Sequence, residues 1–475
     1  MQARVSALIS VCALIVVGFF AACSSGGGSG STMPGKVSVS LSDPPTCAGP
    51  SGAFSHIYVT IQDVQIHQSS TAGPNDPGWV DLTPDLKAAP QQVDLLGIAN
   101  NQCFLAMLGS NTELQAGSYQ QIRVILANTL GGSKTSGSPC GNIANCVVLS
   151  SDSSVHPLDL SSESQTGIKI PSGQLAGGKF TIANGEVKDL NIDFDACASI
   201  VAQPNGHYRL KPVLHAGEMQ LTSTSVTGTL VDSLTSSPIP NATSIVALEQ
   251  KDANGTDRVI MQITPDANGN FVLCPVPAGS YDLVAVSITS TGVAYAATIT
   301  TGVQPGMAIG KIPMVAQSGT STADASITGT VTTSTGSAAT AADISLYAMQ
   351  QVSINGSNVN VIIPLAQQSS STASLTTSST GSCPANTDCA DYTLAVPAMW
   401  PNIGAFSASG TNYSQSSATP VAYSVGATAF VPMSGGTLDC SPSEVTVNTL
   451  QGGGAINVTP GGTVSAAASA FTGCQ

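Results

Sequence analysis

The chain has 475 residues, of which 42% are hydrophobic and only 8% are charged, and its net charge is −14. High hydrophobic content with few charges argues against a disordered chain, and the length predicts roughly two to four domains. The acidic balance argues against nucleic acid as a partner, because such binding requires a basic surface that displaces counterions.

The chain begins with a segment typical of a secretory signal. Arg4 supplies a positive charge, the stretch that follows is almost uninterruptedly apolar as far as Phe20, and small residues precede Cys23. A run this short is typical of a cleaved signal rather than of a membrane span. It resembles the lipobox of bacterial lipoproteins, which implies that residues 1–22 are removed and that Cys23 becomes the diacylated first residue. An ordinary signal peptide cut near Ala22 is the alternative.

The segment that follows Cys23 consists of Gly, Ser and Thr as far as Thr32. Such a composition stays a flexible coil, and about a dozen residues of it span roughly 20 Å. We therefore interpret residues 23–35 as a tether between a membrane and folded domains. By resemblance to Gram-negative lipoproteins, Ser24 after the cysteine implies export to the outer membrane.

Alternation of apolar and polar residues predicts an all-β domain over residues 36–221. The clearest strand runs from Phe54 to His67, and its apolar positions change parity at Gln62–Asp63, which indicates a bulge or a break between two strands. Only Asn101–Leu108 has the pattern of a short helix. The other expected strands are 37–41, 79–82, 93–96, 119–127, 167–170, 187–194 and 208–214.

Five short segments of this region carry a further signal. They are Val39–Pro44, Ile57–Ile61, Gly117–Arg123, Asp193–Asp195 and Tyr208–Pro212. In this order they resemble an uncharacterised domain family of bacterial cell-surface lipoproteins, a domain of unknown function. The resemblance implies no activity and no catalytic residues.

Asp193 and Asp195 are two residues apart on a predicted strand, so they share one of its faces. Paired carboxylates can hold calcium or, when they are about 5 Å apart, catalyse glycoside hydrolysis. We favour the alternative, a solvent-facing strand edge with Ile192 and Phe194 turned inward.

Turn motifs and alternation predict a second β domain over residues 224–316. Asp266–Gly269 has the composition of a turn whose glycine takes a positive φ, and Pro277–Gly279 forms the next turn before the strand that begins at Tyr281. Together with Val226–Asp232, these segments resemble the carboxypeptidase-regulatory-like, or prealbumin-like, β-sandwich. The resemblance implies a non-catalytic accessory module that shares its fold with starch-binding domains.

A third region, residues 326–475, begins with an internal repeat. Ile327–Val331 echoes Val226–Leu230 at an offset of 101 residues, and Tyr392–Pro397 echoes the strand at Tyr281. We interpret this region as a divergent β-sandwich-like domain behind the linker Gln317–Asp324, with Ser/Thr-rich insertions near Gln367–Ser382.

Twelve cysteines are present. One leaves with the signal and one is lipidated, so ten remain, an even number that in an exported chain predicts disulfides. Metal binding is the less favoured alternative, because there is no C-x-x-C motif and no histidine near the closely spaced pairs. The expected pairs are Cys140 with Cys146, Cys383 with Cys389, Cys440 with Cys474 and Cys47 with Cys103, whereas Cys197 and Cys274 have no evident partner.

Few residues suit catalysis. The histidines at 56, 67, 156, 207 and 215 form neither H-x-x-x-H nor H-E-x-x-H, and the sequence has no G-x-S-x-G or S-x-x-K motif. We expect no catalytic residue, no metal and no cofactor.

The chain is only 4% aromatic and has two tryptophans. Trp79 opens a predicted strand and is expected in the core. Prolines at 397 and 401 flank Trp400, which predicts a loop. Because sugar recognition uses exposed aromatic rings, Trp400 is the candidate ligand-binding residue. The alternative is a tryptophan folded over the end of its own sandwich.

The sequence therefore predicts tandem β-sandwich-like domains behind a lipoprotein signal peptide and a tether. The expected protein is non-enzymatic and lipid-anchored in the bacterial envelope, where it displays its domains for adhesion or scaffolding. Its expected partners are the membrane, through the anchor, and carbohydrate or other envelope proteins. A carbohydrate-binding accessory lipoprotein of a polysaccharide-uptake system and a hydrolase with an unrecognised site are the alternatives.

Overall fold

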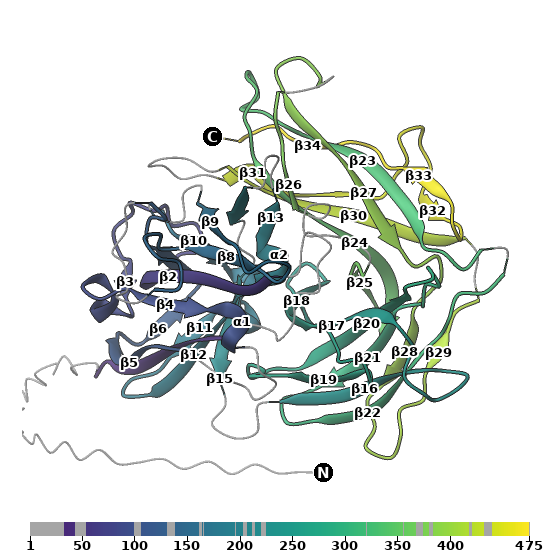
Figure 1. Ribbon diagram of the computed structural model, residues 1–475, viewed down its shortest axis with the longest axis horizontal. Helices are drawn as coiled ribbons and strands as arrows, with labels where there is room; N and C mark the ends of the chain where they lie inside the picture. The colour runs from purple at the N-terminus through teal and green to yellow at the C-terminus, as the bar shows by residue number, and fades with distance from the viewer. Residues whose placement is uncertain are drawn as a thin grey trace, which may run out of the picture. The chain divides into compact units, whose positions relative to one another are not determined.

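The computed structural model confirms the all-β fold class (Figure 1), since the helices among the residues that it describes have only three or four residues. It describes residues 33–42, 54–98, 106–130, 138–160, 164, 166–194, 196–202, 207–210, 214–219, 225–319, 321–354, 356–366, 374–379, 383–417, 420–431 and 439–474. Cys23, Cys47, Cys103, Asp195, the signal and most of the tether lie outside these ranges. Within them, no helix is long and apolar enough to cross a membrane.

The first region is built from short strands with brief helical turns between them. In chain order they are β1 Gly35–Ser42, β2 Phe54–His67, β3 Val80–Asp81, η1 Pro84–Lys87, β4 Gln91–Asp94, α1 Leu95–Ile98, β5 Ala106–Leu114, β6 Gly117–Tyr119, β7 Gln121–Leu126, β8 Cys146–Leu149, β9 Val155–Asp159, β10 Ile168–Pro171, η2 Ser172–Gln174, η3 Ala176–Gly178, β11 Phe180–Ile182, β12 Val187–Phe194, α2 Ala196–Ser199, β13 Ile200–Ala202, β14 Tyr208–Leu210 and β15 Leu214–Met219.

Two sheets enclose the core of this region. One has the order β15-β12-β1-β5, and the other follows the path β10-β7-β2-β8-β9-β14-β13, with β3 and β4 beside β2. The apolar positions of β1 and β2 point into the space between the sheets, and Val39, Leu41, Ile57 and Val59 have no exposed surface.

The predicted parity change in β2 is a bulge. Ile61 pairs with Leu126 and Asp63 with Ile125, so Gln62 is the extra residue on β2. The helix expected at Asn101–Leu108 is wrong for its described end, because residues 106–108 belong to strand β5; residues 101–105 lie outside the described ranges.

The second and third regions contain longer strands. The second has β16 Val226–Asp232, β17 Ala242–Lys251, β18 Thr256–Ile263, β19 Asn270–Leu273, β20 Tyr281–Thr289, β21 Thr298–Val303 and β22 Ala308–Met314. The third has β23 Ala325–Thr333, β24 Asp343–Ile354, β25 Ser357–Ile363, β26 Ser374–Thr376, β27 Asp388–Val396, β28 Asn402–Ala405, β29 Ser414–Gln415, β30 Val421–Phe430, β31 Asp439–Val447, β32 Ile456–Val458, β33 Thr463–Ser465 and β34 Ser469–Phe471.

In the second region the sheet β19-β16-β22 packs on β17, β18, β20 and β21 around one apolar cluster. The turn predicted at Asp266–Gly269 is present. The Asp266 carboxylate accepts bonds from the backbone N–H groups of Asn268 (2.9 Å) and Asn270 (2.8 Å), and Gly269 has a φ of 78°. The side chain and the glycine together fix the turn that leads into β19.

The Thr-Gly-Thr repeat, which is Val226–Leu230 and Ile327–Val331, occupies equivalent strands. β16 lies between antiparallel β19 and parallel β22, and β23 lies between antiparallel β27 and parallel β33. Gly228 lies opposite Phe271, and the ring covers the glycine. Gly329 lies opposite Tyr392 in the same way. Tyr392 is thus the counterpart of Phe271, and its predicted equivalence with Tyr281, which lies on β20 in the other sheet, is wrong.

Backbone pairing joins the second and third regions into one sheet. Its path is β29-β28-β21-β20-β17-β18-β25-β24-β30-β31, and Figure 1 shows β17, β20, β21 and β28 side by side. Two parallel contacts make the junction, β18 with β25 and β21 with β28. Gln317, in the predicted linker, is buried. Its backbone N–H donates to the Ala294 carbonyl of the second region at 2.8 Å, and its side chain accepts a bond from the Ala398 N–H of the third at 3.1 Å. The linker is therefore fastened to both of its neighbours.

We expect Gly329→Ala to destabilise the fold. A methyl group at this position would overlap the buried ring of Tyr392, and overpacking of this kind costs about 1–3 kcal/mol. Thermal melting measures the effect. Gly452→Ala is the matched control, because nothing lies within 4 Å of its added carbon; equal stability of the two variants would contradict the role of the ring contact.

Candidate functional site

Around Asp193, its sheet is buried on both faces. Alternate residues of β1, β12 and β15 face the apolar core. The opposite face carries polar residues that are nevertheless buried, with exposed fractions of 1–6%: Ser40, Ser42, Asn191, Asp193 and His215. At Gly217 this face is covered by Pro277, and the Ala278 N–H donates to the Glu218 carbonyl at 3.0 Å.

Asp193 occupies the middle of this polar face. β12 is paired on both sides, so the expectation of a solvent-facing strand edge is wrong. Ser42 lies opposite Asp193 on one side and donates to its carboxylate at 2.8 Å, and His215 lies opposite it on the other side. The Asn191 amide donates to Ser42 at 2.8 Å, which extends the polar contacts along the strand. Asp195, the predicted partner of Asp193, lies outside the described residues.

Sequence reasoning missed Ser42 and His215. The alternation of Ser with Val and Leu in β1 indicated a polar face, but nothing in the chain showed that this face meets residues about 150 positions away. Strand pairing alone brings these residues together.

The order of the three side chains argues against hydrolytic chemistry. A nucleophilic serine needs a histidine within hydrogen-bonding reach. Here Asp193 stands between Ser42 and His215, which are two strands apart, or about 10 Å. Burial lowers the pKa of His215 to about 4, so the imidazole is neutral at physiological pH. The arrangement fits a structural polar ladder better than a catalytic triad.

Trp400 lies in the loop between β27 and β28, as the flanking prolines predicted. Its side chain is partly buried and packs against the apolar cluster of the third region, and its carbonyl accepts a bond from the Gln415 amide at 2.6 Å. The nearby hydroxyl of Tyr413 bonds to Thr300 at 2.7 Å. The loop is therefore well anchored, with part of the indole exposed.

The expectation that Trp79 lies in the core is wrong. It is only partly buried, and the guanidinium of Arg123 lies 4.1 Å from its ring centroid. The indole N–H donates to the Gly73 carbonyl at 2.8 Å. Trp79 thus covers a buried arginine at the outer face of β2 and β7.

Disulfides join Cys140 to Cys146, Cys383 to Cys389, and Cys440 to Cys474. Their Cα–Cα distances are 5.8, 5.5 and 3.8 Å. Cys274, which had no evident partner in the sequence, is also disulfide-bonded. In the described part of the chain, no group of three or more His, Cys, Asp or Glu residues is placed to hold a metal ion.

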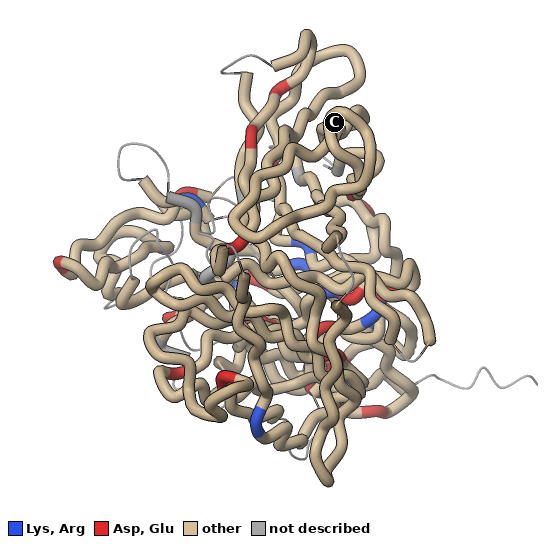
Figure 2. The backbone as a smooth tube through the Cα atoms, turned by 90° about the vertical axis from the view of Figure 1, so that its right-hand side faces the viewer, with Lys and Arg blue, Asp and Glu red and all other residues tan. Residues whose placement is uncertain are grey.

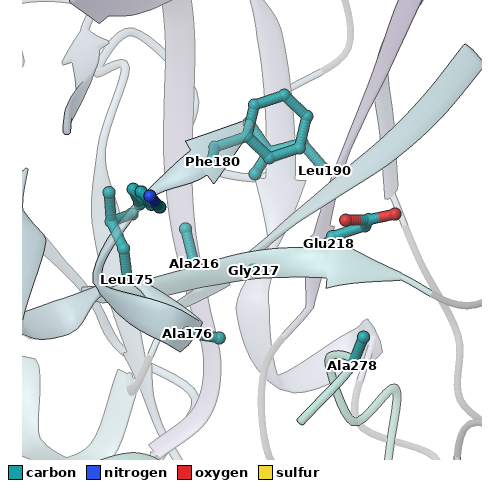
Figure 3. Close-up of a pocket in the computed structure, with 9 residues that line it drawn as sticks. Leu175, Ala176, Phe180, Leu190, Ala216, Gly217, Glu218 and Ala278 are labelled. Atoms are coloured by element: carbon teal, nitrogen blue, oxygen red, sulfur yellow. The ribbon is translucent and has the colours of Figure 1, made fainter. Parts of the chain in front are cut away.

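A small cavity lies against strand β15 (Figure 3). Its volume is about 60 Å³, and Figure 3 shows Phe180, Leu190, Ala216 and Ala278 at its wall. Ligand pockets measure roughly 300–1,000 Å³, so this space suits a few water molecules rather than a substrate.

We predict that Asp193→Ala lowers stability by about 1–3 kcal/mol, because it leaves the buried Ser42 hydroxyl without its acceptor. Denaturant unfolding measures the change. Asp189→Ala is the control: Asp189 lies on the same strand and face but is partly exposed, and its replacement should cost no more than about 0.5 kcal/mol. An unchanged midpoint for Asp193→Ala would show that the ladder is not structural.

Comparison with known protein families finds a match for one region of the chain. No curated protein matches its sequence. Similar solved structures include the Bacillus anthracis TIE protein, with 11% identity over 93% of this chain and 51% of that one and a TM-score of 0.15. The shaft pilin SpaA from Lactobacillus rhamnosus GG has 12% identity over 60% of this chain and 99% of that one, with a TM-score of 0.16. The minor pilin GBS52 of Streptococcus agalactiae has 9% identity over 52% and 96%, with a TM-score of 0.17.

The chain spans about half the length of the TIE protein. TM-scores this low carry no argument about function. The sequence match is confined to the first region and agrees with the resemblance found there: residues 34–212, less than half of the chain, match the family described as a Domain of unknown function (DUF4382).

Proposed function

We propose that the protein is a non-enzymatic, lipid-anchored protein of the bacterial envelope that displays a rigid β-structure for adhesion or scaffolding. The observation that carries this proposal is the continuous sheet that joins the second and third regions. A rigid body on a flexible tether is suited to presenting a surface at a distance from a membrane. It is less suited to closing around a substrate.

Side-chain contacts strengthen this junction. A single guanidinium nitrogen of Arg258, on β18, donates to both carboxylate oxygens of Glu444, on β31, at 2.8 and 2.9 Å. The other nitrogens of Arg258 reach Asp252 and the Tyr347 hydroxyl, each at 2.9 Å. A separate, partly buried ion pair joins Arg209 of the first region to Asp343 of the third at 2.7 Å.

The disulfides support export, because such bonds persist in oxidising compartments. The lipobox-like segment supports anchoring at Cys23 in the outer membrane; two or more acyl chains hold a protein stably, at about 0.8 kcal/mol for each buried methylene. The strand arrangement of residues 224–316 supports a carboxypeptidase-regulatory-like β-sandwich as one displayed module. The membrane, carbohydrate and other envelope proteins are the proposed partners.

Cys23→Ser tests the anchor. We expect the wild type to incorporate labelled palmitate and to fractionate with the outer membrane, and the variant to lose the label and remain an uncleaved or soluble precursor. Cells that carry the variant should lose any surface adhesion conferred by the wild type. Membrane retention without lipid labelling would contradict the anchor, and hydrolysis of a polysaccharide or an ester by the purified protein would contradict the non-enzymatic function.

Carbohydrate binding is a second candidate, favoured by the partly exposed indole of Trp400 in an anchored loop. If the chain binds a glycan, Trp400→Ala should weaken binding about 5- to 150-fold, the loss of roughly 1–3 kcal/mol expected for one aromatic anchor. A glycan array followed by calorimetry measures this. Trp79→Ala is the matched control, since Trp79 stacks on Arg123 in another region; equal weakening by both variants would contradict a site at Trp400.

A further inference from the structure

Three carboxyl groups meet on the sheet where the second region joins the third. Glu249 of β17 lies directly opposite Asp282 of β20. Asp257 of β18 lies opposite Lys251 of β17 on one side and opposite Val361 of β25 on the other. The cluster therefore borders the pairing between β18 and β25, which is one of the two backbone junctions between the regions.

Two of these groups are buried, Asp282 is partly exposed, and few hydrogen-bond donors reach the cluster. Glu249 has no exposed surface and Asp257 is 1% exposed. One oxygen of Glu249 accepts a bond from the Ile362 N–H of β25 at 3.2 Å, and its other oxygen has no partner. No N–H group reaches either oxygen of Asp257, whose carboxyl group contacts that of Asp282. The Gly302 N–H of β21 donates to Asp282 at 3.3 Å.

Positive charge near the cluster is limited. Among the described residues, Lys251 of β17 and Arg258 of β18 are the cations that act on it, and Asp252 adds a further negative charge. The Lys251 side chain is exposed. Arg258 is already bonded to Asp252, Tyr347 and Glu444. From β25 the cluster meets a backbone N–H group and the apolar Val361.

Three neighbouring carboxylates, two of them buried and without matching cations, would repel one another strongly, because burial removes the water that solvates charge. A proton shared between two such groups removes the repulsion and supplies the missing hydrogen-bond donor. We propose that the Glu249–Asp257–Asp282 cluster is a pH-sensitive latch, in which bound protons hold β18 against β25 and the loss of those protons loosens the junction between the second and third regions.

The pKa shifts agree in direction. Burial, with the neighbouring Asp282, raises the pKa of Asp257 to about 8. Burial also raises the pKa of Asp282, and burial with the neighbouring Asp257 raises that of Glu249. The folded protein then holds protons that the unfolded chain has released. Stability from this cluster is therefore full below the ordinary carboxyl pKa of about 4 and is lost as the pH rises toward about 8.

The first test compares the full chain with Glu249→Gln/Asp257→Asn, which keeps the volume of both side chains and removes their titration. We expect the melting temperature of the wild type to fall between about pH 6 and about pH 9, and that of the variant to fall by less than half as much. Asp85→Asn removes one exposed carboxylate elsewhere and should keep the wild-type dependence. The same pH dependence in all three proteins would overturn the proposal.

The second test needs no substitution. Hydrogen exchange at the amides of β25, corrected for the intrinsic effect of pH, reports local opening of the junction. We expect Ile362 to lose protection between about pH 6 and about pH 9 while Leu394, in the ladder between β23 and β27, keeps it. Parallel loss at both sites would indicate global unfolding and would overturn a local latch, as would full protection at Ile362 throughout.

Discussion

Backbone pairing between strands of different regions is the constraint on which the rest of the structure depends. The pairings of β18 with β25 and of β21 with β28 join one sheet of each sandwich into a continuous sheet. As a result, the outward face of β20 and β21 is buried with the third region, whose apolar cluster includes Val284, Val286 and Ile299. Each sandwich therefore depends on its neighbour for part of its core.

A few of the charges of this chain join different regions. Figure 2 shows Lys, Arg, Asp and Glu as sparse segments along the backbone, and they make up only 8% of the residues. Arg209 with Asp343 and Arg258 with Glu444 nevertheless form partly buried ion pairs between regions. Breaking a buried pair leaves an uncompensated charge, which is strongly destabilising. These contacts therefore specify how the regions fit together more than they add to net stability.

The polar ladder around Asp193 illustrates how burial decides the role of a carboxylate. In a cleft, a serine, an aspartate and a histidine would suggest hydrolysis. On this sheet they lie side by side in an order that separates the serine from the histidine, with a turn of the second region against the same face at Gly217. Their chemistry is used in hydrogen bonding within the fold. The scaffolding function that we propose is consistent with this use.

The sequence by itself determined the all-β class, the bulge in β2, the turn at Asp266 and the loop around Trp400, because alternation, glycine and proline act over a few residues. It also indicated the Thr-Gly-Thr repeat but matched Tyr392 to the wrong strand. Only the tertiary structure decided that Asp193 is buried beside Ser42 and that Glu249 meets Asp282. These contacts join strands that are far apart in the chain, and local patterns carry no information about which strands become neighbours.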